Sequence, residues 1–259
     1  MLIVAVALLP VTVFLILLVA FDSFKLVPTS TLARAIAAGA GAALVAWPLH
    51  AWLFASTGLD PVPFSRYVAP LTEETLKALF VLYAIQRRQI GFLVDAAIVG
   101  FAIGAGFATV ENLEYLRDLP DRRVWVWIAR GFGTAMLHAS TTAIVAVGLK
   151  SIRDRYPERG LLAVVPPWIV AVALHALFNY ALVSPVLAAG VPMVVLPLVV
   201  IVVFQRSERM TREWVGDGLD LDVQLLEIIR SSSFGGTRIG RYLQELRLRF
   251  PGPIVADMF

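Results

Sequence analysis

Three charged side chains stand within a stretch of sequence that is otherwise apolar enough to cross a membrane. Glu73, Glu74 and Lys77 all lie in the segment 66–85. A charge near the centre of a bilayer costs about 2.5–3.5 kcal/mol on insertion scales, so three of them oppose insertion by about 8–10 kcal/mol. Groups of this kind pair with one another or face a wet cavity. We therefore expect this segment to form one wall of a functional site.

Further polar side chains stand in the other apolar stretches, namely Glu111, His138, His175 and Asn179. Neighbouring membrane helices run in opposite directions, so polar residues without a common role would fall at unrelated depths. We counted about 1.5 Å per residue from the outer end of each expected helix. The count places these four residues and the glutamate pair in the outer half of the membrane. We therefore expect them to converge on one site.

Helical spacing strengthens this expectation, because residues at i and i+4 share a face. Glu73 and Lys77 have this spacing, and so do His175 and Asn179. Lys77 also reaches Glu74 at i+3 and is expected to act as a counter-ion. Adjacent glutamates diverge by about 100° around a helix, so one can face the site while the other contacts Lys77 or a neighbouring helix. The spacing leaves open which glutamate does which.

Peptide hydrolysis is a reaction that this set of side chains can carry out. A carboxylate activates water as a general base, a histidine or an asparagine stabilises the developing oxyanion, and a carboxylic acid protonates the leaving amine. Alternatively, glutamate and histidine bind a divalent metal that lowers the pKa of its water. The expected cofactor is therefore one divalent metal such as zinc, or none. The possible metal ligands are Glu73, Glu74, Glu111, His138 and His175.

Other catalytic classes lack their motifs in this chain. There is no cysteine, no His-Glu-x-x-His and no Gly-x-Ser-x-Gly. The Gly-Asp pair of intramembrane aspartyl proteases has its sole counterpart at Gly216-Asp217, in the charged tail. We expect His50 and Asp95 to be interfacial or structural, and Asn112 to bond locally.

The elements that must position these residues are membrane helices. The chain is 59% hydrophobic and 16% charged, against about 45–50% and about 25% in soluble domains. From Leu161 to Phe204 there is no charged side chain; that stretch would make roughly 66 Å of helix, about twice the hydrocarbon thickness, so it must fold back. The expected fold class is an all-α polytopic bundle of about seven spans. The expected spans are 1–21, 35–56, 66–85, 91–114, 126–149, 161–183 and 187–204.

The charge pattern suggests how the chain is organised and oriented. We expect a transmembrane bundle over residues 1–204, with its core at 60–185, and a small helical cytoplasmic tail over 205–259. Basic residues gather on the side that carries the loop near Arg87 and the loop from Lys150, which places that side in the cytoplasm. The protein is thus expected in the plasma (inner) membrane, with its N-terminus outside and its C-terminus in the cytoplasm. The net charge of +3 does not call for nucleic acid as a partner.

Four motifs occur in order on successive expected helices. Glu73-Glu-Thr-Leu-Lys77 resembles the E-E-x-x-K element of PrsW-type membrane proteases, and Phe107-Ala-Thr-Val-Glu111-Asn112 resembles their F-x-x-x-E(N) element. His175-Ala-Leu-Phe-Asn179 resembles their last element, often H-x-x-x-D. His138 falls on the helix between, where a histidine is also expected. The resemblance covers about residues 60–185 and extends to the related prenyl-protein (CAAX) proteases.

This resemblance implies proteolysis of a membrane-anchored regulator, such as an anti-sigma factor, near the outer face of the membrane. It implies that Glu73 or Glu74 activates water. Glu111 stands where the CAAX relatives have histidine, and His175 and Asn179 stand where oxyanion-stabilising residues are expected. Asn179 replaces the usual aspartate, which weakens any mechanism that needs an anionic ligand at that position.

Two other functions are compatible with charged residues in the membrane. A proton- or ion-coupled transporter keeps such groups too, but it should show repeats or paired broken helices. The sequence has no evident repeat, although Pro166-Pro167 and Pro197 could break helices. A non-catalytic scaffold would bind membrane peptides in the same cavity without cutting them.

Overall fold

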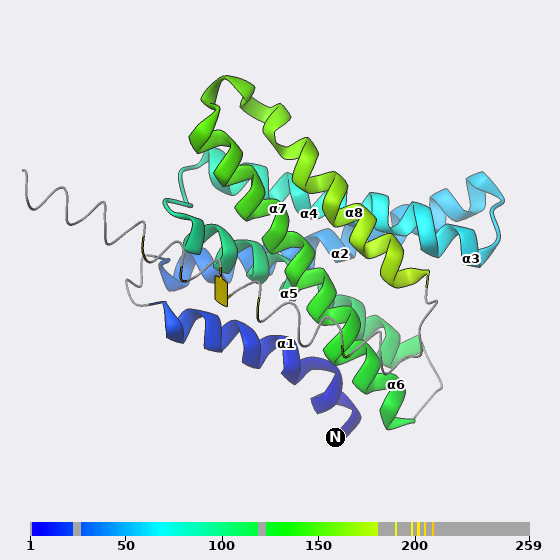
Figure 1. Cartoon of the computed structure of the whole chain (residues 1–259). Helices are drawn as coiled ribbons and strands as arrows, with labels where there is room; N and C mark the ends of the chain where they lie inside the picture. The colour runs from blue at the N-terminus through cyan, green and yellow to red at the C-terminus, as the bar shows by residue number, and fades with distance from the viewer. Residues whose placement is uncertain are drawn as a thin grey trace, which may run out of the picture. The chain divides into compact units, whose positions relative to one another are not determined.

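The fold is helical throughout the part of the chain that the structure describes. The computed structural model describes residues 2–22, 27–118 and 123–180, together with single residues at 190, 198, 201, 202, 205 and 209. Its longer helices are α1 (Leu2–Phe21), α2 (Thr29–Thr57), α4 (Ala69–Gln86), α5 (Leu93–Asp118), α7 (Ala135–Arg155) and α8 (Val165–Asn179). Shorter helical segments are α3 (Pro61–Pro63), η1 (Phe64–Val68), α6 (Val124–Ile128), η2 (Ala129–Thr134) and η3 (Pro157–Val164). Figure 1 shows their arrangement.

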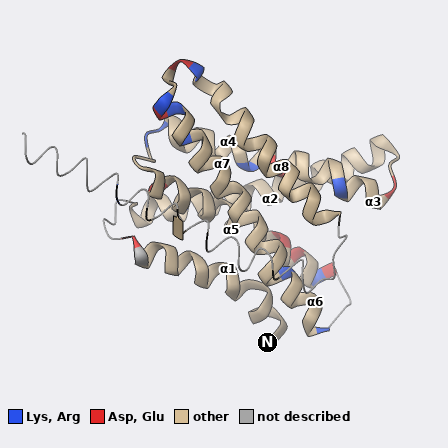
Figure 2. Ribbon diagram, in the orientation of Figure 1, with Lys and Arg blue, Asp and Glu red and all other residues tan. Residues whose placement is uncertain are grey.

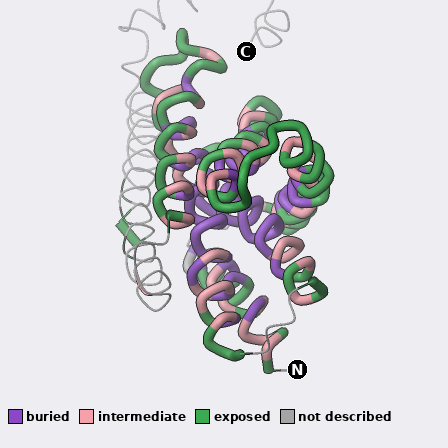
Figure 3. The backbone as a smooth tube through the Cα atoms, turned by 90° about the vertical axis from the view of Figure 1, so that its right-hand side faces the viewer, coloured by how far each residue is buried: buried purple, intermediate pink, exposed green. Residues whose placement is uncertain are grey.

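Helix α5 is the centre of the bundle and packs most extensively against α7 and α2. Its residues from Val94 to Ala108 are all buried, and Figure 3 shows buried backbone at the centre with exposed backbone around it. Small residues allow this close packing. A side chain at Gly104 would collide with the backbone of His138 on α7, and one at Gly39 on α2 would collide with the backbone of Ile103. The close α5–α7 contact therefore holds the helix that carries Glu111 beside the helix that carries His138.

Five helices in the described residues are long and apolar enough to cross a membrane. They are Leu2–Ala20, Thr29–Thr57, Leu93–Asp118, Val124–Arg155 and Pro157–Asn179. Figure 2 shows that their ribbons carry few charges except toward their ends. Many large apolar side chains on these helices are exposed, among them Val13, Leu44 and Leu177, as suits a surface in contact with lipid. These findings support an integral membrane protein.

These helices correspond to five of the seven expected spans, with shifted bounds. The second begins at Thr29 rather than residue 35, directly after Pro28. The sixth begins with the 3₁₀ segment Pro157–Val164, which bends at Gly160, and ends at Asn179 rather than residue 183. The expected span 187–204 and the tail 205–259 lie outside the continuously described residues, so the count of seven and the tail stay predictions.

Helix α4 corresponds to the expected span 66–85 but carries its charges inward. It packs against α2, α7 and α8, and Glu73, Glu74 and Lys77 are all buried. Charged groups this deep in a bundle need partners or a polar cavity. The three charged side chains of α4 therefore lie inside the bundle, where they contact residues of α2, α5, α7 and α8.

Candidate active site

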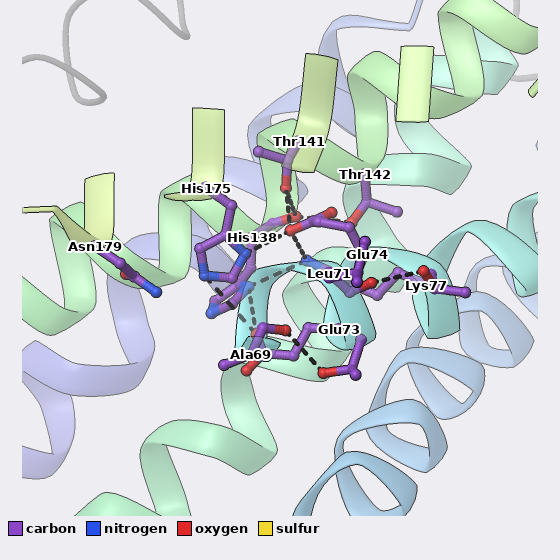
Figure 4. A network of polar contacts seen from close by, with 12 residues as sticks. Ala69, Leu71, Glu73, Glu74, Lys77, His138, Thr141, Thr142, His175 and Asn179 are labelled. Carbon is purple, nitrogen blue, oxygen red and sulfur yellow. Dashed lines mark hydrogen bonds and ion pairs between the residues drawn. The ribbon is translucent and has the colours of Figure 1, made fainter. Parts of the chain in front are cut away.

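Glu74 is a buried hydrogen-bond acceptor whose partners come from three helices, α4, α7 and α8 (Figure 4). Its Oε1 lies 2.7 Å from Lys77 Nζ on the same helix and 2.8 Å from His175 Nδ1 on α8. The hydroxyl of Thr141 on α7 donates to the same oxygen over 3.1 Å. Glu74 and Lys77 are both shielded from solvent. This arrangement pairs the two buried charges and fixes the ring of His175.

Glu73 points elsewhere, into a cavity of about 270 Å³ that Glu111 and His50 also line. Its Oε2 lies 3.8 Å from His138 Nδ1 and 3.9 Å from His175 Nε2. That oxygen is buried and has no hydrogen-bond partner among the described residues. The adjacent glutamates are thus separated as helical geometry allows, with Glu73 in the cavity and Glu74 on Lys77.

His138 and Glu111 form a second histidine–glutamate pair. His138 Nε2 lies 2.9 Å from Glu111 Oε2, although the two atoms are not aligned as in a hydrogen bond. Arg130 Nη2 lies 3.4 Å from the other oxygen of Glu111. On the far side of the ring, Lys77 Nζ lies 3.1 Å from His138 Nδ1. Lys77 therefore contacts both pairs.

The partners define where the ring protons sit. A carboxylate accepts only, so His175 donates from Nδ1 to Glu74 and presents the lone pair of Nε2 toward Glu73. An ammonium donates only, so the Nδ1 atom of His138 accepts from Lys77, and in the neutral ring the proton sits on Nε2, facing Glu111. Each histidine thus turns its protonated nitrogen to a glutamate and its lone pair toward the Glu73 side.

This donor set fits a divalent metal. Glu73, His138 and His175 each offer one ligand atom, and these atoms all lie within 4.8 Å of one another. Two histidines and one glutamate form a known zinc-binding combination, and histidine ligands usually give their other N–H to a carboxylate or carbonyl. To bind a metal through Nδ1, His138 would have to exchange its contact with Lys77 for the ion.

Asn179 is not brought into this cluster. Its Nδ2 donates to the carbonyl oxygen of Ser65 on η1 over 2.9 Å, and Figure 4 shows its side chain apart from the glutamates. Its role in oxyanion stabilisation stays a prediction. Asp95 lies near the start of α5, where its Oδ2 accepts from the N–H groups of Gly91 and Phe92, a structural contact as expected.

The prediction for Asn112 was wrong. Its Nδ2 donates to the carbonyl oxygen of Ala7 on α1 over 2.8 Å, which joins positions far apart in the sequence. Its Oδ1 accepts from Arg130 Nε over 3.1 Å. A local bond was expected because the side chain lies near a helix end; instead, α1 packs directly against this part of α5.

Sequence reasoning also missed three residues around the site. Thr141 follows His138 by one helical turn and reaches Glu74. Arg130 lies near the start of the expected span 126–149, a position at which an arginine commonly marks topology. His50, expected to be structural, lines the cavity with its Nδ1 3.9 Å from Glu73 Oε1. The chain has three histidines, and each lies inside an expected span, a signal that could have pointed to His50.

Comparison with known proteins identifies the family. No curated protein and no solved structure matched the chain. The family described as PrsW family intramembrane metalloprotease matches residues 24–205, which is well over half of the sequence and includes every residue of the cluster. The match begins after α1. The chain belongs to the PrsW family of intramembrane metalloproteases.

Proposed function

We propose that this membrane protease hydrolyses a peptide bond of a membrane-anchored protein in the cavity beside Glu73. The observation that carries the proposal is the placement of that carboxylate. Glu73 lines the cavity, its Oε2 is buried without a hydrogen-bond partner among the described residues, and all three histidines of the chain come within 4 Å of it. A carboxylate in this setting can take a proton from water or bind a metal.

Glu73, His138 and His175 would hold the metal that the family name implies. A divalent cation bound by these residues would activate water and polarise the scissile carbonyl. Glu74 orients the ring of His175, and Lys77 and Thr141 in turn hold Glu74 in place. Glu111 faces the protonated nitrogen of His138 in the same way. Glu74 and Glu111 thus orient the two histidines that would bind the metal.

The cavity also suggests what kind of substrate enters. Besides its carboxylates it is lined by aromatic side chains, among them Trp47, Phe64 and Phe107. Aromatic rings can pack against the side chains of a short unwound peptide segment, and the polar residues of the cavity can bond its backbone, which needs partners inside a membrane. The depth count and the distribution of basic residues support cleavage near the outer face, with the N-terminus outside. A single-span regulator of the anti-sigma-factor kind is the substrate class that fits.

The decisive experiment replaces Glu73 and measures cleavage of a tagged single-span reporter in proteoliposomes. We expect E73Q to abolish cleavage while leaving the protein folded, because the buried Oε2 of Glu73 has no hydrogen-bond partner within the described residues. D95N is the matched control: it changes a buried carboxylate near the start of α5, outside the cavity, and should cleave normally per folded molecule. Full cleavage by E73Q would overturn the proposal.

Metal analysis of the same preparations separates the two roles of Glu73. If Glu73 is a metal ligand, E73Q also loses the metal that copurifies with the wild type, and a chelator stops wild-type cleavage. If Glu73 acts on water alone, cleavage is lost in E73Q while its metal content stays that of the wild type.

A further inference from the structure

Arg130 lies just behind the site and makes three contacts at once. Its Nη2 is 3.4 Å from Glu111 Oε1, and its Nε donates to Asn112 Oδ1 over 3.1 Å. Its guanidinium group lies over the ring of Tyr115, 3.4 Å from the centroid. All three partners are on α5, whereas Arg130 is on the π-helical segment η2. Such π segments often occur at functional sites.

Asn112 links this arginine to the first helix. It is 1% exposed and donates from Nδ2 to the carbonyl oxygen of Ala7 on α1. The same helix lies against η2, where a side chain at Gly131 would collide with the backbone of Val6. Helix α1 precedes the residues that match the family. Helix α1 nevertheless contacts Asn112, which follows Glu111 in the sequence, and Gly131, which follows Arg130.

The charges explain why Glu111 needs this partner. Glu73, Glu74 and Glu111 bring three carboxylates into one buried region. Lys77 forms its ion pair with Glu74. Arg130 is the cation that lies against Glu111. Without it, mutual repulsion would favour turning Glu111 away from His138 and Glu73 toward the mouth of the cavity.

We propose that Arg130 is a positioning residue of the active site: it holds Glu111 against His138, and Asn112 with α1 holds Arg130. The inference rests on the proposed function, since it assigns a role within that site. A planar guanidinium bonds Asn112 through Nε, faces Glu111 through Nη2 and lies over the ring of Tyr115, and the compact ammonium of a lysine does not reproduce this fixed planar geometry. The arginine is therefore needed for its shape as well as its charge.

A double-mutant cycle tests the proposal, with E111Q, R130Q and the double variant assayed on the tagged reporter. Loss of a group that orients a ligand costs about 10–100-fold, and we expect a fall in kcat of this size with KM unchanged for R130Q. If Arg130 acts through Glu111, R130Q has no further effect in the E111Q background. Effects that multiply in the double variant would overturn the proposal.

R130K and R66Q complete the experiment. R130K keeps the charge, so it should restore thermal stability if R130Q folds poorly, yet recover only part of kcat. Full recovery of kcat by R130K would overturn the need for a guanidinium. Arg66, like Arg130, belongs to a π segment and stacks on a tyrosine: its guanidinium lies 4.4 Å from the ring centroid of Tyr180. R66Q is therefore a matched control that should leave kcat unchanged.

Thermal unfolding of the same four proteins of the cycle provides a readout that needs no activity. It should show a coupling between Glu111 and Arg130, and additive shifts would count against the contact. A wild type that cleaves no reporter refutes the proposed function, whereas a cleaving wild type with independent effects of the two substitutions refutes this inference alone.

Discussion

The two histidine–glutamate pairs of the site use the same chemistry in different surroundings. In the inner pair, His175 donates to Glu74 in an aligned bond of 2.8 Å, and Glu74 is sealed from solvent with Lys77 and Thr141 around it. In the outer pair, His138 and Glu111 are 2.9 Å apart without alignment, and the side chain of Glu111 is 18% exposed to the cavity.

The difference indicates how the site divides its work. The inner pair is held by three contacts, because Glu74 Oε1 accepts from Lys77, His175 and Thr141. It can therefore hold one metal ligand or catalytic histidine in a fixed place. The outer pair borders the cavity and has one ion pair behind it, so it can adjust when a peptide enters. Preorganisation on one side and adjustability on the other suit an intramembrane protease, which must both fix its catalytic groups and admit a peptide.

The largest expected effect follows from breaking the inner pair. E74Q leaves Lys77 buried without its carboxylate, and removing one partner of a buried pair costs about 3–5 kcal/mol. We expect a matching fall in the free energy of unfolding in detergent, together with loss of cleavage. K77M should be comparably destabilised, and the double variant E74Q/K77M should recover part of the loss. Near-normal stability of E74Q would show that the inner pair is not the rigid one.

Changing the outer pair should separate activity from stability. E111Q removes a charge that borders the cavity, so the protein should unfold at nearly the wild-type temperature, while kcat falls about 10–100-fold as for other residues that orient a catalytic group. The measurement is cleavage of the tagged reporter beside thermal unfolding. A loss of stability as large as that of E74Q would remove the contrast between the two pairs.

The sequence predicted which side chains come together better than it predicted how they are arranged. Depth counting grouped Glu73, Glu74, Glu111, His138, His175 and Asn179, because depth depends only on distance along a helix. The structure brings the first five together and leaves Asn179 on the carbonyl oxygen of Ser65. Which glutamate faces the cavity depends on the rotation of α4 against its neighbours. That rotation is determined by how α4 packs against α2, α7 and α8, and no local pattern encodes it.

Other contacts around the site could not be predicted from the sequence for a similar reason. The bond from Asn112 to Ala7 and the contact of Arg130 with Glu111 join separate helices. By sequence alone Arg130 does not differ from the arginines that mark the ends of membrane spans; its position beside α5 distinguishes it. The span bounds shifted where helices continue through 3₁₀ and π segments, as at Pro157–Val164 and Ala129–Thr134, which hydropathy does not reveal.

A smaller change tests how much each contact adds to the inner pair. T141V removes the hydroxyl that donates to Glu74, and a hydrogen bond to a charged group contributes about 1.5–3 kcal/mol. We expect the lower end, because the same hydroxyl also lies 3.2 Å from the carbonyl oxygen of His138. T142V is the matched control: its hydroxyl donates to that carbonyl within its own helix, so its loss should cost under about 1 kcal/mol. Equal losses in chemical unfolding would mean that Thr141 does not support Glu74.

The smallest expected effect concerns Asn179, one turn beyond His175 on the inner side. Its amide donates to the carbonyl oxygen of Ser65 rather than toward Glu73, so N179A should lose one partly exposed hydrogen bond, about 1 kcal/mol. Cleavage should then change by less than about threefold, because the loss of an oxyanion donor would instead lower kcat by about 10²–10³. Reporter cleavage at saturating substrate distinguishes the two outcomes. A loss of the larger size would mean that Asn179 leaves Ser65 when substrate binds, and that the inner side also moves during the reaction.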